Sequence, residues 1–328
     1  MKQSLANLNG KTVVVTGASG YIGSELVKTL VSQSCNVIGY GRSEMRPILG
    51  AKSVAADIQE FETWWNIVKQ ADIIYHLAGN TSAYEASKNP SGSLTSTLLP
   101  ITHLIKAAKD QQKKPRLVYA STVTIYGVTP ERPVSEKFEP KPLTIYDLHK
   151  LFAEQQLALA AEQNLLESVS LRLANVYGPS SSISKAIDRG ILNKFTSLAL
   201  EGNELQIYGN GNYIRDYIYI SDVVNAFMLA GITPQINGMS FNIASGLGKT
   251  LNEAVMLMAS KSEIKTGLPV KINYIEWPSG SNPIEMRQFT ADISEYKSAT
   301  GWSPVVSFED GLALMLDELL KDIGNNGK

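Results

Sequence analysis

The chain has 328 residues, of which 44% are hydrophobic and 19% are charged, a composition typical of a globular protein with a large core. Lysine and arginine number 30 against 31 acidic residues, so the formal net charge of -1 excludes the basic surface that would bind nucleic acid or an anionic membrane. One cysteine excludes an intramolecular disulfide and a cysteine-based zinc site, and three scattered histidines do not form a metal site, so we expect no metal.

Two kinds of targeting segment are missing from the sequence. No apolar stretch reaches the roughly 20 residues that would span a bilayer. The first residues, 1–9, lack the apolar core of a signal peptide. We therefore expect a cytoplasmic enzyme or binding protein.

The first half of the chain alternates between strand-like and helix-like segments. Each expected strand is a short apolar run with few charges, which is typical of strands covered on both faces. The expected strands are 12–16, 36–40, 72–77, 117–121 and 168–173, and the expected helices are 21–32, 64–69, 94–110 and 146–164. This order predicts an α/β fold, a Rossmann-type doubly wound parallel sheet.

Glycine, asparagine and proline break the second half into shorter pieces. The expected helices here are 184–200, 222–230, 251–260 and 308–322, and the expected strands are 205–208, 213–220, 240–244 and 271–277. These pieces predict a smaller α+β lobe that binds the substrate. We expect residues 1–178 to form the dinucleotide-binding domain and residues 179–328 mainly the substrate lobe, with residues 213–245 interleaved with the first domain.

A glycine-rich turn separates the first expected strand from the first expected helix. It reads TGASGYIG from Thr16 to Gly23, a G-x-x-G-x-x-G spacing. Glycines let the backbone approach a pyrophosphate, and a helix N-terminus offers free N–H groups. A place after a strand and before a helix favours a dinucleotide site over a turn without a ligand. The residues expected to bind the cofactor here are Gly17, Ser19, Gly20, Tyr21, Ile22 and Gly23.

Tyr146 and Lys150 stand four residues apart in an expected helix, so they share one face of it. A nearby ammonium favours the phenolate and should lower the pKa of Tyr146 from its usual ~10 toward the working range. Such a tyrosine can take a proton from a sugar hydroxyl or give one to a ketone.

A hydroxyl at the end of the strand 117–121 could hydrogen-bond the oxygen that changes between alcohol and ketone. Ser121, Thr122 and Thr124 all stand there. Their positions do not distinguish them, and each hydroxyl could instead cap the strand end.

The glycine turn, the hydroxyl strand end and the Tyr-x-x-x-Lys spacing, in this order, resemble the extended short-chain dehydrogenase/reductases. The nearest branch is the NAD-dependent epimerase/dehydratase group typified by UDP-glucose 4-epimerase, and the resemblance covers nearly the whole chain. It implies that Thr122, five positions before Gly127, is the catalytic hydroxyl residue and that Tyr146 is the acid/base. It also implies that Lys150 binds the nicotinamide ribose and that the enzyme forms a homodimer.

Two more segments resemble positions where this family binds its cofactor. Asp57 and Ile58 correspond to the pair that contacts the adenine. Leu77, Ala78 and Gly79 correspond to the strand end that passes the cofactor.

The resemblance also implies a nucleotide-diphosphate sugar as substrate. Asn175 is expected to contact it, and Arg215 to bind its diphosphate. A nearly neutral protein needs local cations for this ligand, and a guanidinium makes paired hydrogen bonds to phosphate oxygens. Arg287 is the second candidate. A salt bridge with Asp216 or Asp222 is the alternative role for Arg215.

Two positions depart from the family pattern. Members that prefer NAD carry an acid at the end of the second strand, where this chain has Gly41 followed by Arg42. This favours NADP, or a loose choice between NADP and NAD, unless Arg42 is a solvated loop residue. The dehydratases carry two acids where this chain has Val123 and Thr124. Dehydration would therefore need Glu85 or another acid.

The leading prediction is a sugar-nucleotide 4-epimerase that acts through a transient 4-keto sugar. The runner-up is an NADPH-dependent 4-keto-sugar-nucleotide reductase, which Arg42 favours. A dinucleotide-binding regulator without catalysis is the third alternative, and the joint presence of Thr122, Tyr146 and Lys150 argues against it.

Overall fold

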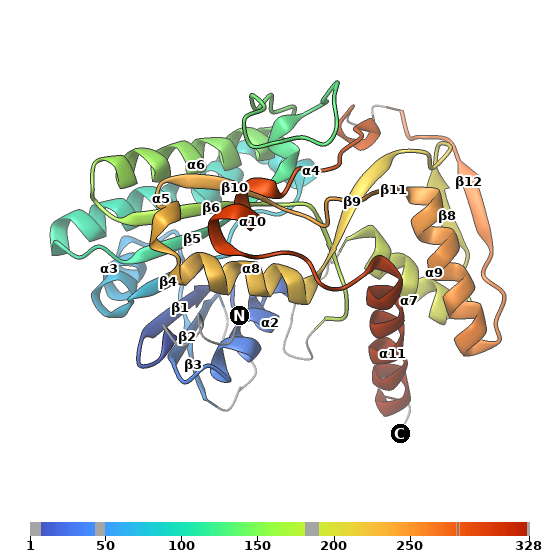
Figure 1. Ribbon diagram of the computed structural model, residues 1–328, viewed down its shortest axis with the longest axis horizontal. Helices are drawn as coiled ribbons and strands as arrows, with labels where there is room; N and C mark the ends of the chain where they lie inside the picture. Colours follow the sequence, from blue (N-terminus) through green and yellow to red (C-terminus); the bar gives the residue numbers. More distant parts are fainter. Residues whose placement is uncertain (1–7, 43–49, 181–189, 280, 282, 327–328) are drawn as a thin grey trace.

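The computed structural model describes residues 8–42, 50–180, 190–279, 281 and 283–326. Its centre is a seven-stranded sheet in the order β10-β6-β5-β4-β1-β2-β3 (Figure 1). All neighbouring strands run parallel, and the chain winds outward from β1 in both directions. The strands are β1 (Thr12–Thr16), β2 (Asn36–Gly41), β3 (Ala51–Ala55), β4 (Ile73–His76), β5 (Arg116–Thr122), β6 (Glu167–Leu173) and β10 (Met239–Ile243). The predicted doubly wound α/β fold is confirmed.

Helices cover both faces of this sheet. Val13 and Val15 of β1 pack with α2 (Tyr21–Val31) and α8 (Ile220–Ile232) on one face. Val14 points to the other face, which is covered by three further helices. These helices are α3 (Phe61–Gln70), α5 (Pro90–Gln111) and α6 (Ile145–Glu162). Successive strand residues point to opposite faces, so β1 is buried on both sides, as its apolar run predicts.

A smaller α+β lobe lies beside the sheet, at the right of Figure 1. It contains a three-stranded sheet, β11-β9-β7, and a two-stranded sheet, β12-β8. The strands are β7 (Asn175–Tyr177), β8 (Leu205–Tyr208), β9 (Ile214–Tyr219), β11 (Gly248–Thr250) and β12 (Ile272–Ile275). The helices packed around them are α7 (Ile191–Leu200), α9 (Leu251–Thr266) and α11 (Phe308–Asn326).

Several short elements were not predicted from the sequence. They are β3, β7, β11, α4 (Ala83–Lys88), the 3-10 turns η2 (Val123–Tyr126), η3 (Pro234–Ile236) and η4 (Pro283–Met286), and α10 (Ser294–Thr300). β3 lies at the sheet edge, where Lys52 is exposed and an apolar run is not required. The predicted helix 184–200 begins at Ile191, and its residues 184–189 lie outside the described part.

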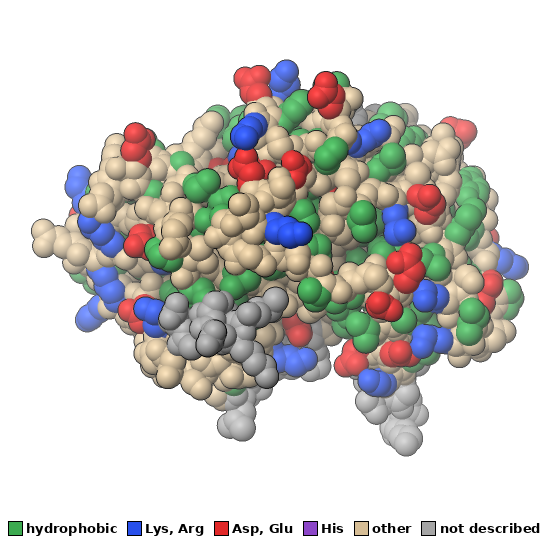
Figure 2. All heavy atoms as spheres, viewed as in Figure 1, with side chains coloured by type: hydrophobic (Ala, Val, Ile, Leu, Met, Phe, Trp, Pro, Cys, Tyr) green, Lys and Arg blue, Asp and Glu red, His purple; other side chains and the backbone are tan. Residues whose placement is uncertain are grey.

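Acidic and basic side chains are interspersed over the face shown in Figure 2. Within the described part of the chain, no helix combines the length and the apolar character needed to cross a membrane.

A buried ion pair fastens α6 to β6. Arg172 donates from Nε and Nη2 to both carboxylate oxygens of Glu154 at 2.8–3.2 Å. It also donates from Nη1 to the Tyr126 hydroxyl at 2.7 Å. The two charged side chains are only 9% and 3% exposed. Removal of one partner would therefore leave an uncompensated charge in the interior.

We expect Glu154→Ala to lower the free energy of unfolding by about 3–5 kcal/mol, because Arg172 stays buried without its counter-charge. Urea denaturation measures this loss. The matched control is Glu318→Ala, which breaks an exposed 3.3 Å pair with Lys321 and should cost less than about 1 kcal/mol. Equal losses in the two variants would contradict the prediction.

Candidate active site

The glycine turn joins the carboxyl end of β1 to the start of α2. Gly17 has a φ of +71°, and a Cβ on it would lie 2.7 Å from the Ala78 nitrogen. A Cβ on Gly23 would lie 2.1 Å from the Gly17 carbonyl oxygen. Gly20 is the N-cap residue of α2, and no side chain forms a capping hydrogen bond there. The turn is therefore a cradle of backbone N–H groups that side chains would fill, which fits the pyrophosphate of a dinucleotide.

The strand end after β4 lies against this cradle. The backbone nitrogen of Leu77 donates to the Thr16 carbonyl at 3.2 Å, and that of Ala78 donates to Thr16 Oγ1 at 3.4 Å. Gly79 follows with a φ of +147°. Because the carboxyl ends of parallel strands meet at one edge, Gly17 and Gly79 lie at the same edge of the sheet.

The other predicted cofactor residues lie around this edge in different surroundings. Ser19 is half-buried, Ile22 packs against the sheet core, and the Tyr21 hydroxyl donates to the Gly178 carbonyl at 2.9 Å. Tyr21 thus also ties the turn to the chain that enters the smaller lobe.

Three more predicted cofactor residues follow β2 and β3. Asp57 is exposed and accepts a hydrogen bond from the Gln59 nitrogen at 2.9 Å. Ile58 packs against the core on the α3 side. Arg42 is exposed directly after β2, so its guanidinium is accessible at this end of the strand.

Tyr146 stands at the start of α6, where a capping box fixes the helix. Thr144 Oγ1 accepts from the Asp147 nitrogen at 3.1 Å, and Asp147 Oδ2 accepts from the Thr144 nitrogen at 3.2 Å. One turn further, Lys150 is buried and donates to the Ala120 carbonyl at 2.8 Å. Its ammonium lies 5.9 Å from the centroid of the Tyr146 ring. The spacing in sequence therefore brings the two side chains to one face, at the carboxyl end of β5.

The pKa of Tyr146 shifts in the direction opposite to the predicted one. Burial and the Asp147 carboxylate raise the pKa of the phenol above its usual value, while a hydrogen bond with Thr122 and the charge of Arg287 lower it. The predicted lowering by Lys150 is wrong for this structure, because its ammonium is held by the Ala120 carbonyl and is itself desolvated. Burial lowers the pKa of Lys150 to about 8.

The three hydroxyls at the end of β5 have different partners. Thr122 is the one that hydrogen-bonds Tyr146. The Thr124 hydroxyl lies 3.0 Å from that of Thr122 and donates to the Asp147 carboxylate. The Ser121 hydroxyl is buried and has no hydrogen-bond partner among the residues that the structure describes. Thr122 is thus the hydroxyl beside the phenol.

The two predicted arginines lie together. Arg215 on β9 donates to the Arg287 carbonyl, and to the Glu285 carbonyl at 2.5 Å. The alternative salt bridge is not formed, since Asp216 and Asp222 accept from backbone N–H groups instead.

Arg287 connects this pair to the tyrosine. Burial and the charge of Arg215 lower the pKa of Arg287 to about 10, although the charges of Asp147 and Tyr146 act to raise it. Two half-buried guanidinium groups that repel each other next to a phenol are typical of an anion site.

Asn175 on β7 lies in the same small sheet as Arg215. Its side-chain nitrogen donates to the Asp216 carbonyl at 3.2 Å. Asp147 is the site residue that sequence reasoning missed, and its only signal was the Thr-x-x-Asp capping pattern. Among the described residues, no group of three or more histidine, cysteine and acidic side chains could hold a metal ion.

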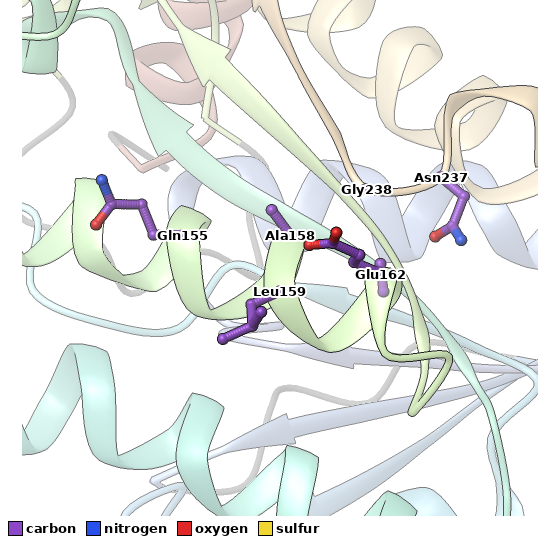
Figure 3. Close-up of a pocket in the computed structure, with 7 residues that line it drawn as sticks. Gln155, Ala158, Leu159, Glu162, Asn237 and Gly238 are labelled. Carbon is purple, nitrogen blue, oxygen red and sulfur yellow. The ribbon is translucent and has the colours of Figure 1, made fainter.

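A surface depression of about 540 Å³ lies elsewhere, on the outer face of α6 (Figure 3). It is lined by Gln155, Ala158, Leu159, Ala161, Glu162, Asn237 and Gly238. These residues come from the second half of α6 and from the turn before β10, whereas Tyr146 stands at the start of α6. The depression is therefore separate from the candidate active site.

The glycine cradle after β1, and the phenol and hydroxyl at the end of β5, lie along the same edge of a doubly wound sheet. Together they define a dinucleotide-binding α/β enzyme. Residues 13–244 match the NAD dependent epimerase/dehydratase family, and the chain belongs to this family. The predicted family is confirmed.

Relatives of known structure and activity cover nearly the whole chain. The UDP-glucose 4-epimerase of Mycolicibacterium smegmatis is 27% identical over 314 residues, which is 92% of this chain and 96% of that protein. The structure of Thermotoga maritima UDP-glucose 4-epimerase with UDP-glucose shares 28% identity and a TM-score of 0.84, over 95% of this chain and 99% of that chain. The Bacillus cereus UDP-glucuronic acid 4-epimerase, in complex with UDP-glucuronic acid and NAD, shares 26% identity and a TM-score of 0.81, over 94% and 99%.

Proposed function

We propose that the chain is a sugar-nucleotide 4-epimerase that acts through a transient 4-keto sugar. The observation that carries this proposal is that Thr122 and Arg287 both act on Tyr146, at the sheet edge that also carries the glycine cradle. A diphosphate bound by Arg215 and Arg287, with Asn175 contacting the sugar nucleotide, would direct the sugar toward the phenol. The two 4-epimerase structures described above, which hold UDP-sugars, support this class of substrate.

In this scheme, side chains of the protein transfer the proton and bind the substrate oxygen. When bound, a nicotinamide dinucleotide would supply the hydride chemistry of the reaction. Tyr146 takes the proton from the 4-hydroxyl and later gives it back. Thr122 would hydrogen-bond the same oxygen, and Lys150 would bind the nicotinamide ribose. The glycine cradle would hold the pyrophosphate, Leu77, Ala78 and Gly79 would border the cofactor, and Asp57 and Ile58 would contact the adenine.

Incubation with sugar nucleotides and no reductant tests the proposal. UDP-glucose, UDP-galactose, UDP-N-acetylglucosamine and UDP-glucuronic acid are each mixed with the purified enzyme and a trace of NAD. Interconversion of two 4-epimers supports the epimerase. In a parallel incubation with added NADPH, consumption of one NADPH for each product formed would overturn it in favour of the second candidate, a 4-keto-sugar-nucleotide reductase, which Arg42 favours.

The proposed cofactor preference rests on the residues at the end of β2. NAD is bound in the Bacillus cereus structure, and we propose that this chain accepts NADP as well and favours it. Gly41 ends β2 where an acid would repel a 2′-phosphate, and the exposed Arg42 follows.

We expect Arg42→Ala to weaken NADP binding about tenfold and to change NAD binding less than about twofold, because only the 2′-phosphate offers the guanidinium a partner. Calorimetry with both dinucleotides measures this. Lys52→Ala, on the neighbouring strand β3, removes another exposed cation and is the control. A wild type that binds NAD more tightly than NADP contradicts the proposal.

We also propose a homodimer formed through α5 and α6. Phe152 and Leu159 lie two turns apart on α6 and are 41% and 51% exposed, and Leu94 on α5 is 47% exposed. Apolar side chains on two adjacent helices favour a four-helix contact with a second copy. Leu159 also borders the depression in Figure 3.

The double variant Phe152→Glu with Leu159→Glu should be monomeric, because it places charges in this contact. Light scattering after size-exclusion chromatography measures the mass. Leu268→Glu, at a 46% exposed residue after α9, is the control and should stay dimeric. A monomeric wild type would overturn the proposal.

The division into two units, 1–178 and mainly 179–328, is part of the proposal. The return of β10 to the large sheet, where it pairs with β6, supports an interleaved segment at 213–245. We further propose that the enzyme works in the cytoplasm, which cell fractionation tests.

A further inference from the structure

Asp216 follows Arg215 on β9, and its carboxylate binds the backbone of two distant segments. Oδ1 accepts from the Ser245 nitrogen at 2.8 Å and from the Ser245 hydroxyl at 2.6 Å. Oδ2 accepts from the Gly246 nitrogen at 3.1 Å and from the Ala291 nitrogen at 3.2 Å. The side chain is fully buried. A buried charge is costly unless it is hydrogen-bonded, and both oxygens of Asp216 meet this condition.

The two segments come from different parts of the molecule. The turn 245–246 leaves β10, the edge strand of the large sheet, and leads to β11 of the smaller lobe (Figure 1). Residues 285–291 lie between β12 and α10 in the sequence and include Arg287. Asp216 therefore joins a strand of the smaller lobe to the end of the large sheet and to the segment that carries the second candidate arginine.

Residues 285–291 are held against β9 by both neighbouring side chains. The Arg215 guanidinium donates to the Arg287 carbonyl toward one end of the segment. The Asp216 carboxylate accepts from the Ala291 nitrogen at the other end. Because Arg287 lies within the segment that these contacts hold, β9 sets the place of its backbone beside Arg215.

A backbone contact lies between these two side-chain contacts. The Phe289 nitrogen donates to the Ile214 carbonyl at 3.1 Å. This single bond joins the segment to the start of β9 and has no link to the turn 245–246. The carboxylate of Asp216 joins all three parts in one place.

We propose that Asp216 is a positioning residue for the substrate diphosphate. Its carboxylate fixes residues 285–291 on β9, so that Arg287 stays beside Arg215 and both guanidinium groups can bind one diphosphate. This inference rests on the proposed function, which assigns the diphosphate to these two arginines. Asp216 itself is buried and binds backbone, so it acts on the ligand through Arg287.

Asp216→Asn keeps the shape of the side chain and replaces one acceptor oxygen with an NH2 donor. In one orientation this donor faces the Ser245 N–H, and in the other it faces those of Gly246 and Ala291. We expect the Kd of UDP, measured by calorimetry, to rise about tenfold. The Kd of the dinucleotide should stay within about twofold, because its cradle lies after β1.

Asp222 provides the matched control. Its carboxylate is 1% exposed and accepts from the Val305 and Val306 nitrogens, both at 3.1 Å. Asp222→Asn therefore creates the same conflict with backbone N–H groups away from residues 285–291. It should leave the Kd of UDP and of the dinucleotide within about twofold, even where the melting temperature falls.

Three results would overturn the positioning role of Asp216. One is an unchanged affinity for UDP in Asp216→Asn. Another is an equal loss of affinity for UDP and for the dinucleotide in this variant. The third is an equal loss of UDP affinity in Asp222→Asn, since the effect would then follow from any buried aspartate that binds backbone.

A double variant tests whether Asp216 acts through Arg287. When Asp216→Asn is added to Arg287→Ala, the affinity for UDP should fall less than about threefold further, because the guanidinium that Asp216 positions is already gone. A further loss of about threefold or more would show that Asp216 acts independently and would overturn the proposal.

Ser245→Ala tests the same carboxylate if Asp216→Asn does not fold. It removes one donor to Oδ1 and leaves the backbone N–H groups in place. We expect the Kd of UDP to rise about threefold, and an unchanged Kd would overturn the proposal. If the wild type binds UDP but interconverts no sugar nucleotide, the proposed epimerase fails while the test of Asp216 stands. A wild type that binds no UDP would overturn both.

Discussion

Tyr146→Phe is expected to lower kcat about 10³-fold, because phenylalanine has no proton to exchange with the 4-oxygen of the sugar. The phenol is half-buried at the start of α6 and hydrogen-bonds Thr122. No cap or core contact depends on its hydroxyl in the contacts described above, so stability and dinucleotide affinity should change little. Steady-state turnover of the UDP-sugar pair, with the melting temperature and the Kd of the dinucleotide, measures the three quantities.

The matched control removes the same atom from another tyrosine. Tyr274 on β12 is 45% exposed, and its hydroxyl donates to Asn252 at 3.2 Å. Tyr274→Phe should keep full turnover. A loss of less than about tenfold in Tyr146→Phe would contradict the acid/base role.

Gly23→Ala is expected to weaken dinucleotide binding by at least about 100-fold, or about 2.7 kcal/mol. The added Cβ would lie 2.1 Å from the Gly17 carbonyl oxygen, and backbone cannot yield as a flexible side chain can. The turn must move, and the N–H groups at the start of α2 move with it. Fluorescence titration with reduced dinucleotide measures the Kd.

The control for this prediction is a glycine with a positive φ and open surroundings. Gly267, at the end of α9, has a φ of +71°, and a Cβ added to it would have no neighbouring atom within 4 Å. Gly267→Ala should lower stability by about 1 kcal/mol and leave the Kd unchanged. Undiminished affinity in Gly23→Ala would contradict the assignment of the cradle.

Local pattern explains why part of the fold could be predicted. β1 spans Thr12–Thr16 as expected, and α2 ends one residue before its expected limit, because an apolar run, a glycine turn and an amphipathic segment follow one another without interruption. β7 was missed since three residues carry no periodicity, and β3 because an edge strand needs no apolar run.

Part of the candidate site could likewise be predicted from the sequence, and part could not. The four-residue spacing of Tyr146 and Lys150 is a property of one helix, so the sequence could place them on one face. The pKa of Tyr146 depends on burial, on Asp147 and on Arg287. Arg287 comes from a segment far along the chain, and the two oxygens of Asp147 contact different elements. Contacts of this kind exist only after folding, and spacing alone does not encode them.

The most direct test of the proposed reaction follows one hydrogen from substrate to product. UDP-glucose carrying deuterium at C4 is converted by the enzyme without added reductant, and the product is examined by NMR and mass spectrometry. A 4-epimerase returns the deuterium to C4 of the product sugar, with none released to water. Deuterium in the solvent or in free reduced dinucleotide, or a panel of labelled sugar nucleotides left entirely unconverted, would contradict the central claim that oxidation and reduction occur at the same carbon beside Tyr146.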